Sequence, residues 1–394
     1  MDHFTNDNSI ESPSGALSAV LEDSIMQKGR PVTAGSKILE NFISPLDATV
    51  VSRLEESGIT ISGKTKMSEF GIAGLLPGSD ECASGAVSAI SDGEADFALC
   101  NDYSGAVRRQ TAERGVFYFH PTYGTVSRYG LIPAVPSMDQ IGVVSKTPEA
   151  GLRALTIISG YDAKDGAMLE RGQLAIDYEQ LTTDNKSIRI GVPSNVLSTG
   201  SYPAAIGEFL ENFETVDFEM EYFSVFASVM RILCCAEISS CLTRYDGIKF
   251  GYRANGFSDL HELYAKSRTE ALGSEAKLAS MLGAMVLSKD YYDKYYDKAM
   301  RIRRLIKESL QFDKYDVIIM PADGADTDAR LALHALPMLC GLPSVTLRYR
   351  GRGTMPDGGI TPDGGITLVA GVMNEKALFA ALKVAKLEKQ VFKP

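Results

Sequence analysis

Histidine is scarce in this chain of 394 residues, which contains four: His3, His120, His261 and His334. A hydrolase of the serine–histidine–aspartate type needs an imidazole within hydrogen-bond reach of its nucleophile. His3 lies in a polar N-terminal stretch, His120 stands directly before a proline, and the other two fall in helix-like segments. We therefore expect structural or surface histidines and no triad built around an imidazole.

Motifs for metals and phosphates are also missing. The six cysteines form no Cys-x-x-Cys pair and have no histidine at ligand spacing, so we expect buried thiols in a reducing, cytoplasmic compartment and no zinc site. Neither ESGITISG nor PDGGITPDGG is followed by the Lys-Ser/Thr that opens the helix of a phosphate loop. The sequence therefore predicts no metal and no cofactor.

Positive charge is in deficit, because 40 Lys and Arg stand against 50 Asp and Glu, a formal net charge of −10. This balance argues against broad nucleic-acid binding, so any contact with tRNA is expected to be indirect. The run MRIRRLIK is the exception, with Arg301, Arg304 and Lys307 at three-residue steps. A solvated helix face is the preferred interpretation, and contact with RNA or a partner is the alternative.

Long apolar runs are absent as well. We find no stretch of about 18 apolar residues, so the sequence predicts no membrane span. The polar, acidic N-terminus does not resemble a signal peptide. We expect residues 1–15 to form a flexible, loosely attached tail and residues 16–394 to form a single domain.

The chain does contain apolar segments that alternate between strand and helix patterns. Several strand-like segments are apolar throughout, which favours an α/β fold with a mixed sheet covered by helices on both faces. Residues 204–312 are predicted to be mostly helical. The tandem unit PDGGITPDGGIT (356–367) predicts a hairpin or exposed loop with glycines at positive φ, and a duplication without function is the alternative. The segments are strands at 96–100, 116–120, 187–195, 315–322 and 341–349, and helices at 46–58, 85–93, 149–162 and 374–389.

One loop has the composition of an active site. The segment DYSGAVR (102–108) follows a buried apolar run and contains a glycine, as loops that present nucleophiles do. Asp102, Ser104, Gly105 and Arg108 are residue types common in active sites. Ala106 has no reactive atom, however, so the loop has the surroundings of a nucleophile without the nucleophile.

Longer motifs resemble a known family. FALCNDYSGAVRRQ, HPTYGTVSRYGLIPAVPSMDQIG and ISGYDAKD resemble the core of the amidase signature family. TRYDGIKFGYR, ELYAKSRTEALGSE and LSKDYYDKYYDKAMRIRRLIK resemble one branch, the A subunits of glutamyl-tRNA(Gln) amidotransferase. The resemblance runs from about Glu22 to the C-terminus. It implies the amidase-signature fold, a mixed central sheet between helices with a helix-rich central insertion.

The resemblance also implies where catalysis would take place. The family uses a Ser–Ser–Lys triad, in which one serine attacks the amide, a second relays the proton and a neutral lysine is the base. On this sequence the nucleophile position is Ala106, the relay position is Cys82 and the lysine position is Glu22. All three catalytic roles are therefore substituted together.

Other positions of the family's site differ too. Ser104 replaces a glycine of the loop whose backbone N–H groups would form the oxyanion hole. Ala279 stands where the family's carboxylate-binding arginine is expected, and residues 331–343 lack the expected aspartate. Only 21 residues precede Glu22, so the family's N-terminal helices are mostly missing from this sequence.

Three interpretations follow from this pattern. The preferred one is a catalytically inactive relative that acts as a binding or scaffolding subunit, with an amidotransferase-like subunit or a second copy of itself as partner. The second is altered chemistry using Glu22, Cys82 or Ser104. The third is ordinary amidase or amidotransferase activity. The candidate pocket comprises Glu22, Cys82, Asp102, Tyr103, Ser104, Gly105 and Arg108.

Overall fold

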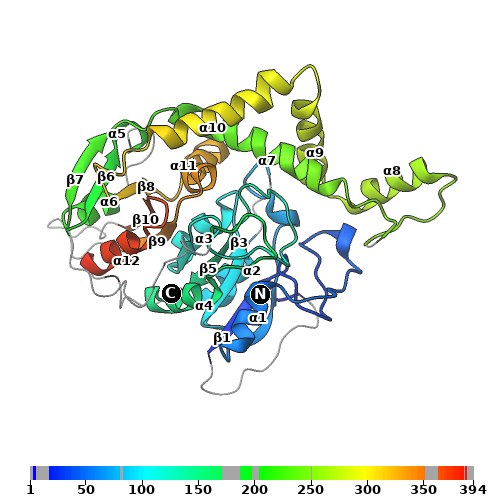
Figure 1. Ribbon diagram of the computed structural model, residues 1–394, viewed down its shortest axis with the longest axis horizontal. Helices are drawn as coiled ribbons and strands as arrows, with labels where there is room; N and C mark the ends of the chain where they lie inside the picture. The colour runs from blue at the N-terminus through cyan, green and yellow to red at the C-terminus, as the bar shows by residue number, and fades with distance from the viewer. Residues whose placement is uncertain are drawn as a thin grey trace.

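The fold is built on one mixed β-sheet (Figure 1). The structure is a computed structural model that describes residues 3–5, 17–79, 83–170, 187–197, 204–249, 251–350, 363–385 and 387. Within these residues the sheet has ten strands in the order β2-β1-β3-β5-β4-β9-β10-β8-β6-β7. The strands are β1 Ser18–Glu22, β2 Thr60–Thr65, β3 Phe97–Asn101, β4 Phe117–His120, β5 Ile141–Ser145, β6 Arg189–Pro193, β7 Glu214–Phe218, β8 Val317–Pro321, β9 Ser344–Arg350 and β10 Asp363–Ala370.

Helices cover both faces of this sheet, as the apolar strands predict. Phe117 and Phe119 of β4 pack on one face with α1, α4, α6 and α12, whereas Tyr118 points to the opposite face, where α2 and α3 lie. Along the sheet, α7 and α11 cover the same opposite face at β8. The helices are α1 Thr49–Glu56, α2 Gly85–Asp92, α3 Ala106–Arg114, α4 Pro148–Ile158, α5 Ser194–Leu197, α6 Ala204–Leu210, α7 Phe226–Leu242, α8 Leu260–Ala271, α9 Ser274–Leu287, α10 Lys298–Ser309, α11 Thr327–Cys340 and α12 Glu375–Val384.

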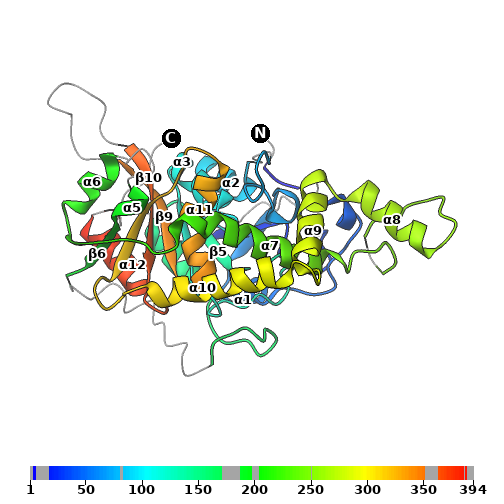
Figure 2. The same ribbon diagram turned by 90° about the horizontal axis from the view of Figure 1, so that it is seen from above.

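The predicted helix-rich part contains α6 to α10, with a π-helical segment over Tyr292–Asp297 before α10. The prediction missed β7, which lies inside this part at the edge of the sheet. Figures 1 and 2 show α8 projecting from the body of the molecule. Phe223–Leu242, which includes α7, is long and apolar enough to span a membrane, but 61% of its apolar stretch is buried inside the fold. A buried core helix can have the same length and apolar composition.

Three local expectations need correction. The helix predicted over 149–162 ends at Ile158, because Ser159 is already extended and Gly160 has positive φ. From Asp363 on, the second copy of PDGGIT forms the start of β10, which pairs antiparallel with β9 as a hairpin does, so its glycines lie in a strand and not in a turn; the first copy lies outside the described residues. Gly365 in β10 does not have positive φ; a Cβ there would lie 2.7 Å from the Cβ of Ala112.

Part of the predicted N-terminal tail is attached to the sheet. Phe4 forms an antiparallel bridge with Thr65, the Thr5 N–H donates to the Lys64 carbonyl, and the Lys66 N–H donates to the His3 carbonyl. His3–Thr5 therefore lie along the outer edge of β2, where loose attachment was expected. Residues 6–15 lie outside the described residues.

Candidate functional site

The candidate site lies where two parallel strands end. β1 and β3 are neighbours in the sheet and run in the same direction, so their last residues, Glu22 and Asn101, lie at the same edge of the sheet. The Asn101 N–H donates a hydrogen bond of 3.1 Å to Glu22 Oε2. The loop 102–105 then leads from β3 directly into α3, whose first residue is Ala106. The sheet thus brings together Glu22 and Ala106, which the resemblance assigns to the family's lysine and nucleophile positions.

Asp102 holds this loop and the start of α3. Its carboxylate accepts hydrogen bonds from the backbone N–H groups of Gly105, Val107 and Arg108 at 2.9 to 3.2 Å. The Arg108 guanidinium donates to the same carboxylate at 3.0 Å and to the His334 carbonyl at 3.0 Å. Both side chains are buried, so they form an ion pair that is satisfied on all sides. Their contacts give Asp102 and Arg108 a structural role.

Gly105 allows α11 to pack against the loop. Its φ is +88°, and a Cβ at this position would lie 2.4 Å from the Cβ of His334. His334 is buried, and its Nε2 donates to the Ala322 carbonyl at 2.9 Å, since a carbonyl can only accept. Nδ1 has no hydrogen-bond partner in the described part. Burial lowers the pKa of His334 to about 3, so the imidazole is neutral.

Sequence reasoning missed the position of His334. It lies on α11, 226 residues from Arg108, to which its backbone carbonyl is hydrogen-bonded. No local motif marks such a contact, because it depends on how α11 packs across the loop. The prediction that all four histidines are structural or on the surface therefore did not single out His334, which packs against Gly105 in the loop before Ala106.

Glu22 is a buried carboxyl group with two hydrogen-bond donors. Ser24 Oγ donates to Glu22 Oε2 at 2.8 Å, and the Asn101 N–H donates to the same oxygen. Burial raises the pKa of Glu22 to about 7 despite these two bonds, and the neighbouring Asp102 carboxylate adds to the rise. Near neutral pH this group can accept or give up a proton, but it cannot supply the amine of the family's lysine.

A buried lysine does lie nearby, on β2. Lys64 is fully buried, and burial lowers its pKa. Its ammonium group forms an ion pair of 3.2 Å with Asp23 and donates to the Pro31 carbonyl. It does not line the cavity beside Ala106. Lys64 is therefore held away from Ala106 and cannot act on a substrate bound beside it.

Small cavities border Ala106 among the described residues. Two of them, each about 20 Å³, include Ser104 and Ala106 in their walls, and each has room for about one water molecule. Tyr103 fills neither, because its side chain points away and its hydroxyl donates to the Phe70 carbonyl at 2.8 Å. The first cavity also contacts Glu22, Ser84, Asp102 and Gln110, and the second contacts Gly105, Arg109, Thr327 and His334.

The remaining predicted residues are placed as follows. Cys82 lies outside the described residues, but Ser84, two positions later, caps α2 through a hydrogen bond from the Val87 N–H and lines the first cavity. Ala279 is buried in α9. In the described part, no group of three or more His, Cys, Asp or Glu residues is arranged to hold a metal ion.

The basic run lies on α10. The side chains of Arg301 and Arg304 are 78% and 80% exposed and pair with Asp297 and Glu308 one turn away along the chain. This arrangement agrees with the preferred interpretation, a solvated helix face. Arg303, between them, turns inward and donates to the Leu339 carbonyl and to Ser137.

Comparisons with known proteins agree on the family. The amidase family model matches residues 8–74 and 82–333. The A subunit of glutamyl-tRNA(Gln) amidotransferase from Lachnoclostridium phytofermentans is 37% identical over 348 residues, covering 80% of this chain and 69% of that protein. The same subunit from Agathobacter rectalis is 38% identical over 338 residues, covering 78% and 67%.

Solved structures share the fold. The A subunit of glutamyl-tRNA(Gln) amidotransferase from Thermotoga maritima has a TM-score of 0.72 at 24% identity, covering 96% of this chain and 86% of that one. This likeness confirms the predicted mixed sheet between two layers of helices. The chain belongs to the amidase family and is homologous to A subunits of glutamyl-tRNA(Gln) amidotransferase.

Proposed function

We propose that this chain is a catalytically inactive member of the amidase family that acts as a binding or scaffolding subunit in the cytoplasm. One observation carries the proposal: the nucleophile position is Ala106, and a buried, hydrogen-bonded glutamate occupies the lysine position beside it. Alanine cannot form an acyl-enzyme. Among the described residues, the two cavities that border Ala106 have volumes of about 20 Å³ each, less than an amide substrate occupies.

Turnover by the purified chain tests the loss of catalysis. Ammonia release from glutamine and from simple aliphatic amides is expected to remain at the level of a blank without protein. Turnover that disappears in the Ser104→Ala or Cys82→Ala variant would overturn the proposal, because the activity would then depend on this site. Turnover that survives both changes but is lost in Glu22→Gln would support altered chemistry instead, and turnover that survives all three changes would be assigned to a contaminant.

A protein partner is the second part of the proposal, and an exposed apolar surface on α9 and the following segment supports it. Met281 is 70% exposed, and a groove of about 300 Å³ runs between α7 and α9. Contiguous apolar surface of this kind is typical of protein interfaces. The other large, exposed apolar side chains of this surface are Leu278, Met285, Tyr291, Tyr292 and Tyr295.

An amidotransferase-like subunit is the expected partner, because the relatives in sequence are themselves named as subunits. Mild affinity purification of the tagged chain from its native cells is expected to recover such a subunit in near-equal amounts. Met281→Glu should abolish the recovery, whereas Ile43→Glu, at a side chain that is 53% exposed elsewhere, should not. Recovery of the chain alone would contradict this part, and association with a second copy would identify the alternative partner.

Altered chemistry is the second candidate function, and Glu22 is the observation that favours it. Glu22 lines a polar cavity together with Asp102 and Ser104, and its pKa of about 7 suits a group that transfers protons near neutral pH. A screen of small carbonyl and amide compounds would support this function if turnover were lost in Glu22→Gln. It would count against it if no compound were converted.

A further inference from the structure

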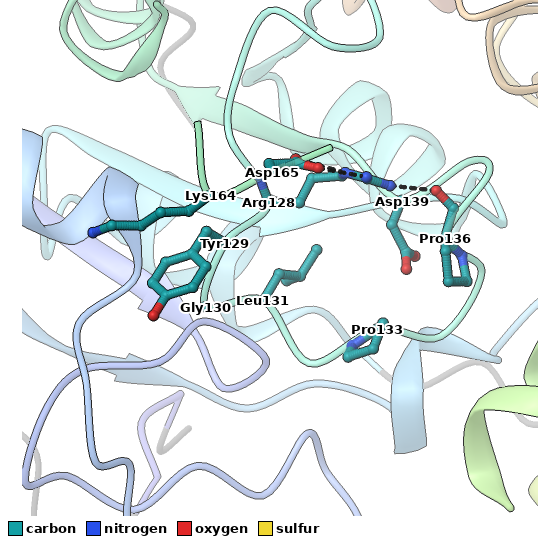
Figure 3. Close-up of a pocket in the computed structure, with 9 residues that line it drawn as sticks. All are labelled: Arg128, Tyr129, Gly130, Leu131, Pro133, Pro136, Asp139, Lys164 and Asp165. Atoms are coloured by element: carbon teal, nitrogen blue, oxygen red, sulfur yellow. Dashed lines mark hydrogen bonds and ion pairs between the residues drawn. The ribbon is translucent and has the colours of Figure 1, made fainter. Parts of the chain in front are cut away.

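Two pockets of similar volume differ in their walls. The pocket of about 270 Å³ in Figure 3 is polar, and Arg128 in it is paired with Asp165. Asp139 accepts three hydrogen bonds there, and Lys164 extends past the Tyr129 ring. The groove of about 300 Å³ between α7 and α9 has mainly apolar walls that open to solvent. Burial of apolar surface is favourable, so the groove offers a partner more than the polar pocket does.

The outer wall of this groove, α9, is apolar on two faces. Ala276 and Ala279 are buried in the same core cluster as the side chains of α7, beside which α9 lies (Figure 2). Leu278, Met281 and Met285 form an exposed stripe on the opposite side of the helix. A helix with apolar residues on both sides is typical of one packed between neighbours. Within the described part of the chain, the stripe has no such neighbour.

The spacing of the stripe indicates what could cover it. Its members are three and four residues apart, the pattern by which the apolar face of one helix packs against another helix. Tyr295 of the π-helical segment lines the same groove, and its ring centre lies 5.8 Å from that of Tyr291. Arg231, the charged residue in the groove wall, is already paired with Asp328 at 2.6 Å. The stripe and the groove therefore offer apolar contact to a helix.

Charge around this surface favours an acidic partner. Between Ser274 and Ser309, eight Lys and Arg stand against five Asp and Glu, although the whole chain has a formal net charge of −10. Lys294 lies 5.8 Å from the centre of the Tyr291 ring. The exposed residues from Lys289 to Lys307 that form no ion pair with a described residue are the lysines Lys289, Lys294, Lys298 and Lys307 and the aspartates Asp290 and Asp293.

We propose that the stripe and the groove bind one amphipathic helix of a partner protein, whose carboxylates flank its apolar face. The apolar face covers the stripe and the groove, and the carboxylates lie toward Lys294 and Lys298. RNA would match the positive charge but not the leucine and methionine side chains of the stripe. The inference rests on the proposed binding of a partner and names the kind of segment that the partner contributes. It does not depend on the loss of catalysis.

Labelled helical peptides test the proposal by fluorescence anisotropy with the full chain. The probe has about 20 residues, with Leu along one face and Glu on the other. One control peptide carries Lys in place of Glu, and another has the composition of the probe in an order that is not amphipathic. The probe is expected to bind at one site per chain, about tenfold or more tighter than either control.

Three results would overturn the proposal. The first is failure of the probe to bind at millimolar concentrations, and the second is equally tight binding of either control peptide. The third is binding of oligouridylate that is tighter than that of the probe, because it would assign the surface to nucleic acid.

Variants test the apolar and the charged part of the surface separately. Met281→Glu should weaken the binding of the probe by about tenfold or more, because it places a carboxylate in the stripe. Lys294→Glu should weaken it as well and should reduce its dependence on salt. Ile43→Glu and Lys28→Glu, at exposed side chains elsewhere, are the matched controls and should leave the binding unchanged. Unchanged affinity in Met281→Glu or in Lys294→Glu would contradict the assignment.

This inference and the proposed function can fail separately. If the tagged chain recovers an amidotransferase-like subunit and Met281→Glu does not reduce the recovery, the proposed function stands and this surface is wrong. If the chain binds the acidic probe but recovers no such subunit, the surface stands and the named partner is wrong.

Discussion

At the scale of single residues, Glu22 makes a prediction about pH. Unfolding returns its pKa from about 7 to the ordinary value of 4.5, so the folded chain binds more protons than the unfolded chain between these values. This one group lowers the free energy of unfolding by roughly 3 kcal/mol as the pH rises through that range. The Glu22→Gln variant keeps an oxygen for Ser24 and Asn101 but carries no charge, so it should lack this loss.

Urea unfolding at about pH 5 and about pH 8 measures the effect. Relative to the unmodified chain, Glu22→Gln should gain stability between the two pH values. Glu211→Gln, which changes an exposed carboxylate, should show no such gain. The free energies of unfolding of Glu22→Gln and the unmodified chain could instead differ by the same amount at both pH values. That result would show that the folded chain does not raise the pKa of Glu22.

Gly105 makes a prediction about packing. Gly105→Ala would place a methyl group 2.4 Å from the Cβ of His334 and a side chain at a φ of +88°. We expect a loss of roughly 3 kcal/mol in the free energy of unfolding, from backbone strain and from the clash with α11. Gly29→Ala is the control, because Gly29 also has positive φ but has no atom within 4 Å of an added Cβ. Equal losses in the two variants would rule out the clash.

At the scale of elements, the edge of β2 is protected by the N-terminal segment. The Lys66 N–H donates to the His3 carbonyl, and an uncovered strand edge would leave such groups to solvent. Deleting residues 2–5 should therefore speed amide hydrogen exchange at Lys66 by about tenfold or more. The Ile59 amide, which donates to the Leu54 carbonyl, should keep its rate. An unchanged rate at Lys66 would mean that His3–Thr5 do not protect this edge.

The elements also show what a sequence reveals and what it does not. The strand FALC, the glycine-bearing loop and the following polar segment were enough to locate the candidate site, because a buried apolar run and a helix start are local signals. β7 was missed because ETVDF is an exposed edge strand without an apolar run. His334 was missed because its contact with Gly105 joins segments far apart in the chain. Lys64 was missed because burial of a lysine depends on the neighbouring strands.

At the scale of the whole molecule, the fold is that of the amidase family, and the change of chemistry at its centre is what we propose. The sheet and both helix layers are those of the amidase fold, and the Asp102–Arg108 ion pair holds the loop before Ala106 within it. On the proposed correspondence, the residues that would attack, relay and accept protons are replaced by Ala106, Cys82 and Glu22. Under the proposed function, one reversion should not restore catalysis, whereas it would repair a chain that had lost a single catalytic residue.

The most direct test is therefore the glutaminase activity of the Ala106→Ser variant. The added hydroxyl fits, because Ala106 borders two cavities of about 20 Å³. Urea unfolding should confirm that the variant is folded. Our account predicts ammonia release from glutamine no faster than from the unmodified chain, because Glu22 cannot replace the lysine. Recovery of glutaminase activity by this single change would contradict it.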